Sequence, residues 1–187
     1  MTDFTLSSGS ICRPYRTPWG AFHKGTYQVS SGVSSAAILT GRPVTLDWTA
    51  NSTNVGKLKA STADATFFLV GIAANDVTGT TAVTGTPIDV YEANPMQEFK
   101  AVTKGGTLQS SQLGLRKTLH WDSTLNIAYV DLSASTAADW RVIVTKFIDN
   151  EGDSGGFVAF RFITRLTENI GSSIAITSTS PLLAFYS

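Results

Sequence analysis

One short run of residues has the composition of a loop that carries a catalytic serine. Residues 152–156 read Gly-Asp-Ser-Gly-Gly and centre on Ser154. A serine hydroxyl attacks a carbonyl carbon when a histidine accepts its proton, and backbone N–H groups of a glycine-rich loop stabilise the oxyanion that forms. His23 would be the base, and Asp64 or Asp76 would orient it, which gives the chain order His, Asp, Ser. Together these residue types are those that catalyse hydrolysis of a peptide or ester bond.

Residues 152–156 resemble the nucleophile motif of chymotrypsin-like serine proteases, but their surroundings depart from that family. The family motif ends in proline where this chain has Phe157, and His23 lies in a proline-containing segment before the first expected strand. Asp, Ser and Gly are also the standard residues of a tight turn. We therefore prefer a turn between a strand ending at Ile148 and one starting at Phe157. The protease, with Ser154 as nucleophile, is the alternative.

Two further groups of polar residues offer weaker chemistry. His120 and Asp122 would share one face of a strand, and a lone pair of this kind is more often a surface hydrogen bond than a catalytic dyad. Asp149, Glu151 and Asp153 alternate as in a calcium-binding loop, but the closing bidentate glutamate of an EF-hand is missing. We expect neither a metal site nor a cofactor.

The elements that would position these residues are mainly strands. The chain contains 25 Thr and 20 Ser, and threonine is favoured on a pleated, half-exposed surface. Short segments of alternating or continuous apolar residues are separated by turns that contain Gly, Pro or Asn. The expected strands are 26–29, 43–48, 57–59, 66–73, 88–91, 98–102, 127–132, 140–147, 157–164 and 174–176. The expected fold is all-β, a single β-sandwich or barrel-like domain over residues 26–187.

The charge and cysteine content exclude several classes of protein. Fourteen Lys and Arg balance fourteen Asp and Glu, whereas binding phosphates by charge needs an excess of cations, so we expect no nucleic-acid partner. The single cysteine, Cys12, excludes an internal disulfide and a four-cysteine zinc site. The first residues lack the pattern of a secretory signal, and no apolar stretch approaches the ~20 residues that cross a bilayer. We expect a protein made in a cytoplasm, with no membrane partner.

Residues 1–25 differ in composition from the rest of the chain. Pro14 and Pro18 disfavour helix in the residues before them, so the segment should be extended. Large aromatic side chains are costly to leave in water. We therefore interpret residues 1–25 as an extended N-terminal arm that docks on the body of the chain or on a neighbour. The residues expected to make these contacts are Arg13, Tyr15, Arg16, Trp19 and Phe22.

The order of apolar and glycine positions in the middle of the chain is its most informative pattern. The four segments that carry it are Gly-Thr-Tyr-Gln-Val at 25–29, Gly-Arg-Pro-Val-Thr-Leu-Asp at 41–47, Phe-Phe-Leu-Val-Gly-Ile-Ala-Ala-Asn-Asp at 67–76 and Gly-Thr-Pro-Ile-Asp-Val-Tyr at 85–91. This succession resembles the small β proteins that tailed bacteriophages carry on their heads, the decoration or cement proteins. The resemblance covers about residues 25–135 and includes no catalytic signature.

The resemblance implies a structural protein of the virion without enzymatic activity. Such a protein would bind the outer surface of the capsid as a homotrimer and stabilise joints between capsomers of the major capsid protein. The arm residues named above would then be the capsid contacts. A tail or fibre component, or a glycan-binding β module with tryptophans on its surface, is a further alternative.

Overall fold

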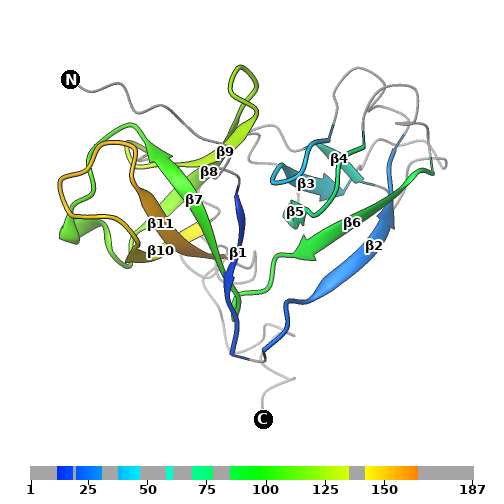
Figure 1. Cartoon of the computed structure of the whole chain (residues 1–187), viewed down its shortest axis with the longest axis horizontal. Coiled ribbons are helices and arrows are strands. Elements are labelled where there is room, and N and C mark those ends of the chain that lie inside the picture. Colours follow the sequence, from blue (N-terminus) through cyan, green and yellow to red (C-terminus); the bar gives the residue numbers. More distant parts are fainter. Residues whose placement is uncertain are drawn as a thin grey trace, which may run out of the picture.

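A computed structural model of the chain describes residues 12–18, 20–30, 38–46, 58–60, 69–77, 85–134 and 142–163. Within these ranges it is all-β, with eleven strands and one short 3₁₀ helix, Ser110–Gln112. The strands form two sheets, which Figure 1 shows side by side, one at the left and one at the right.

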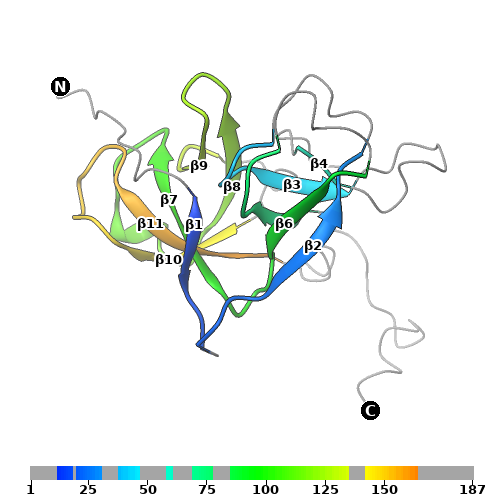
Figure 2. The same cartoon turned by 45° about the vertical axis from the view of Figure 1, so that its right-hand side comes forward.

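The larger sheet has six strands in the order β1-β7-β11-β10-β8-β9. Its neighbours are antiparallel, and β7 also pairs with β9 in parallel. This last pairing closes β7, β11, β10, β8 and β9 into a five-stranded barrel, with β1 added beside β7 (Figure 2). The strands are β1 (Arg13–Arg16), β7 (Glu98–Lys104), β8 (Arg116–Asp122), β9 (Ile127–Asp131), β10 (Val142–Phe147) and β11 (Phe157–Phe162).

The second sheet has five antiparallel strands in the order β2-β6-β5-β3-β4. They are β2 (Lys24–Gln28), β3 (Pro43–Leu46), β4 (Leu58–Ala60), β5 (Leu69–Ala73) and β6 (Pro87–Glu92). Gly71 stands where β5 passes the backbone of β6 so closely that a Cβ atom would overlap the Tyr91 carbonyl oxygen. Only glycine fits that approach without a backbone shift.

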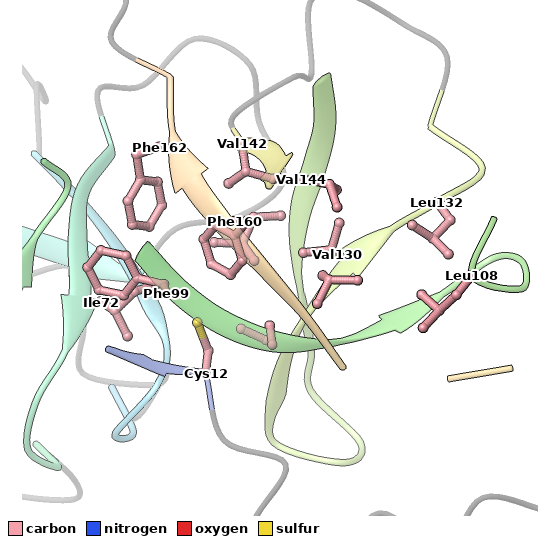
Figure 3. Close-up of a cluster of buried hydrophobic side chains, with 14 residues drawn as sticks. Cys12, Ile72, Phe99, Leu108, Val130, Leu132, Val142, Val144, Phe160 and Phe162 are labelled. Atoms are coloured by element: carbon pink, nitrogen blue, oxygen red, sulfur yellow. The ribbon is translucent and has the colours of Figure 1, made fainter. Parts of the chain in front are cut away.

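Successive side chains along the barrel strands point to opposite faces of the sheet, and those on the inner face form a packed core. Phe99 on β7 lies against Phe160 and Phe162 on β11, with ring centroids 6.0 and 4.9 Å apart. Val130 and Val144 reach the same cluster from β9 and β10, and Figure 3 shows these side chains converging inside the barrel. Burial of each such side chain stabilises the fold by about 1.5–3 kcal/mol.

The two sheets share part of this core. Ile72 of β5 is fully buried within the barrel cluster. Phe22, just before β2, places its ring 6.2 Å from that of Phe99 on the barrel and 6.4 Å from that of Tyr91 on β6. These contacts pack the five-stranded sheet against the barrel.

The all-β prediction is confirmed, and nine strands lie where the sequence pattern places them. The expected strand 174–176 lies outside the described residues. Two strands, β1 and β8, were not in the list of expected strands, although a strand was assumed at His120 and Asp122. Within the expected arm of residues 1–25, residues 13–16 form β1, which pairs with β7, and residues 24–25 begin β2.

Candidate functional site

The loop that contains Ser154 is the connection between β10 and β11. Ile148 donates its backbone N–H to the Phe157 carbonyl at 2.9 Å, as in the closing pair of a hairpin. Gly152 and Gly155 have φ of 93° and 76°, the left-handed conformation that favours glycine in turns. Residues 152–156 therefore lie in the connection between β10 and β11, where the turn interpretation places them.

The other residues of the expected catalytic set are engaged elsewhere. His23 lies before β2, where its Nδ1 is 2.7 Å from Oε2 of Glu92. Asp76 accepts hydrogen bonds from the backbone N–H and the hydroxyl of Thr40, both at 2.6 Å. These bonds hold the pKa of the Asp76 carboxyl below its usual value. Asp64 lies outside the described residues. Among described contacts, neither a hydrogen bond nor an ion pair joins Ser154 to His23 or Asp76, and the serine protease stays the alternative hypothesis.

His120 and Asp122 share one face of β8, as expected, but each has its own partner. The ring of His120 stacks on Tyr129 of β9, with centroids 5.5 Å apart, and its Nε2 lies 3.7 Å from Oδ2 of Asp131. Asp122 forms an ion pair with Lys104 of β7. The hydrogen bond from Lys104, assisted by backbone N–H groups of the following turn, lowers the pKa of the Asp122 carboxyl. This face holds a satisfied polar cluster.

The expected contact residues at the N-terminus divide into exposed and packed groups. Cys12 is buried, with 1% of its surface exposed, and Pro14 faces Phe99 across the β1–β7 pair. Next to these anchors, Arg13, Tyr15 and Arg16 are exposed, and Tyr15 keeps 38% of its surface in solvent. The segment therefore presents its cations and one aromatic ring on a strand that is fixed to the barrel.

Phe22 does not join this exposed group. Phe22 is half-buried because its ring packs against the barrel and against β6. Trp19 lies outside the described residues. The exposed side chains of β1 are therefore the candidate docking site of this chain.

Sequence reasoning missed three residues that complete this site, Lys100, Lys146 and Arg161. Lys100 on β7 lies directly opposite Arg13 on β1 and, on its other side, opposite Ala159 on β11. Ala159 in turn lies opposite Lys146 on β10. Lys100 and Arg161 each stand between two buried apolar residues on their strands, which was the available signal. That signal says only that they face outward, because register between distant strands cannot be derived from local patterns.

Two further properties concern ions and membranes. No group of three or more His, Cys, Asp or Glu side chains in the described ranges is arranged to hold a metal ion. The part of the chain that the structure describes has no helix with the length and apolarity to span a membrane.

Comparison with known proteins finds no matching family model, no matching curated protein and no matching solved structure.

Proposed function

We propose that this protein is a non-enzymatic virion component that binds the outer surface of a tailed-phage capsid and stabilises joints between capsomers of the major capsid protein. The observation that carries the proposal is β1, an anchored strand whose exposed side chains are Arg13, Tyr15 and Arg16. The pattern of residues 25–135, which resembles head decoration proteins, supports the same function.

The anchoring of β1 matters for binding energy. A disordered arm loses conformational entropy when it orders on a partner, and this loss weakens binding. Here Cys12 and the pairing with β7 hold the strand in place before any partner arrives. Arginine and tyrosine are enriched at protein interfaces because each supplies a large contact area together with hydrogen bonds. A fixed strand that presents both types is suited to docking.

If several copies of one contact form together, each contact can be weak and the protein still stays bound to the shell. A homotrimer that contacts three neighbouring capsomers binds with an avidity well above the affinity of one contact, provided that the geometry lets all three engage together. The reinforcement of the shell then comes from many small contacts spread over its joints.

Binding to undecorated shells tests this proposal. Purified protein is mixed with shells of the phage that encodes it, and the bound fraction is measured by co-sedimentation. We expect the wild-type protein to sediment with shells and the triple variant Arg13→Glu/Tyr15→Ala/Arg16→Glu to remain in the supernatant. The control, Lys24→Glu, changes an exposed lysine of β2 and should bind like wild type. Failure of the wild-type protein to bind shells would contradict the proposal.

A further inference from the structure

The outer face of the barrel beside β1 carries an accumulation of cations that is not apparent from the net charge. The register places Arg13, Lys100, Ala159 and Lys146 in one row across β1, β7, β11 and β10. The neighbouring row contains Arg16, opposite Glu98, and Arg161, which bonds to Glu98. We call this surface the cationic face; its members are Arg13, Arg16, Lys100, Lys146 and Arg161.

Among the described residues, the acidic side chains within reach do not balance these cations. Glu98 is the carboxylate inside the rows, and its side chain is only 11% exposed because it pairs with Arg161 at 3.1 Å. Asp149 lies close enough to Lys100 to favour its charged form, but its Oδ2 already accepts the Phe157 N–H. Burial and the neighbouring Arg13 nevertheless lower the pKa of Lys100. The face therefore keeps a surplus of positive charge on a chain whose net charge is zero.

Such a surplus is unfavourable for the isolated fold. Like charges opposite each other on neighbouring strands repel, and Arg13 and Lys100 occupy such a pair. An anionic partner would turn this repulsion into attraction. The cations are accessible to one: Arg13, Arg16 and Lys146 are exposed, and the Arg161 side chain is 44% exposed.

The form of the surface favours a polypeptide as that partner. Among the described strands, β1 pairs with β7 alone, so its other edge offers backbone donors and acceptors to an extended segment. In an extended segment, every second side chain points to the same face. The two rows of the cationic face are likewise two residues apart on β7, at Glu98 and Lys100. A long nucleic acid, by contrast, is attracted by net charge over a wide area, and the net charge here is zero.

We propose that the cationic face binds an acidic polypeptide segment of a partner protein, held in extended form along β1 with carboxylates at alternate positions. The identification of that partner as a capsid rests on the proposed function, whereas the chemistry of the segment rests on the cationic face alone. Binding should weaken as salt rises, because the Debye length falls to about 3 Å at 1 M salt.

The test uses the full chain and a short capped peptide that alternates Glu and Val. Binding is followed by NMR shifts of backbone amides, with the Gln-Val peptide and a single-stranded oligothymidylate as comparison ligands. Lys146→Glu is the informative variant because it lies on the cationic face but outside β1. Lys24→Glu is the control, since it makes the same charge change at an exposed strand lysine of the other sheet, where Lys24 pairs with Asp89. Thermal unfolding of each variant checks that the fold is intact.

We expect the Glu-Val peptide to shift amides of β1 and β7 and to bind more tightly than the Gln-Val peptide. Lys146→Glu should weaken this binding about fivefold, by loss of attraction and gain of repulsion, while Lys24→Glu changes it less than about twofold. Absence of peptide binding, equal effects of the two variants, or tighter binding of the oligothymidylate would overturn the inference. Peptide binding without shell binding would overturn the proposed function and leave the cationic face as an acidic-segment site.

Discussion

The hydroxyl of Tyr27 on β2 donates a 2.7 Å hydrogen bond to Oε1 of Glu92 on β6. Partial burial and this bond raise the pKa of Tyr27 to about 12. The same bond, more than the contact with His23, holds the pKa of Glu92 below its ordinary value of 4.5. The pair therefore links the two strands that lie at one edge of the five-stranded sheet.

Removing the Tyr27 hydroxyl should weaken this link. We predict that Tyr27→Phe lowers the free energy of unfolding at pH 7 by about 1 kcal/mol, the usual net value of one hydrogen bond or slightly more for a charged acceptor. Urea denaturation measures this change. Tyr15→Phe, at an exposed position of β1, is the control and should lie within about 0.5 kcal/mol of wild type.

The contribution of Glu92 should depend on pH in one direction. Its folded pKa is lowered, so its stabilisation is complete above the ordinary value of 4.5 and is lost as pH falls through the folded pKa. The difference in unfolding free energy between wild type and Tyr27→Phe should accordingly shrink below about pH 4. A difference that grows on acidification would show that the bond does not favour the ionised carboxylate.

The close approach of β5 and β6 makes Gly71 hard to replace. A methyl group at Gly71 would overlap the backbone of Tyr91, which is not the end of a flexible side chain and cannot move aside easily. We predict that Gly71→Ala lowers the free energy of unfolding by more than about 2 kcal/mol. Gly106→Ala is the matched control because its added carbon would meet Leu132 at an ordinary 3.6 Å. Similar stabilities of the two variants would be inconsistent with the close approach.

The burial of Cys12 provides a probe of whether β1 is docked. Burial raises the pKa of its thiol, and the thiolate is the reactive form. We predict that an aromatic disulfide reagent at pH 8 modifies the native protein at least about a hundredfold more slowly than the urea-unfolded protein. Equal rates would mean that the segment around Cys12 is not packed against the barrel.

The hairpin geometry around Ser154 leads to a prediction about chemical labelling. Its loop closes between β10 and β11, and the described residues place His23 against Glu92 on the other sheet. We predict that a fluorophosphonate probe does not label the purified protein, as measured by in-gel fluorescence, and that Ser154→Ala behaves identically. Labelling that disappears in Ser154→Ala would establish a reactive serine and favour the protease alternative.

Local patterns predicted much of the fold because most strands carry their own signal. The continuous apolar run that ends in β5 is typical of a buried strand. The alternation of apolar and polar residues in β6 is typical of a half-buried one. The turn at 152–156 was predictable for the same reason, since its residue types are those that turns require.

The remainder depends on contacts between distant parts of the chain. The segment Arg13–Arg16 contains two arginines and a proline, so nothing local marks it as a strand; pairing with β7 makes it one. The cationic face likewise arises only when β7, β11 and β10 align Lys100 with Lys146 through Ala159. Register of this kind is set by tertiary packing, which local sequence does not encode.

The central proposal is that this chain attaches to the outside of a capsid through β1. Electron cryo-microscopy of the virus particle to which we propose that it belongs tests this most directly, because it gives the position, the symmetry and the contacts of the protein at once. We predict density for the barrel on the outer surface at joints between capsomers, in groups of three, with β1 directed toward the major capsid protein. Density confined to the tail, or an outer surface without this protein, would contradict the account.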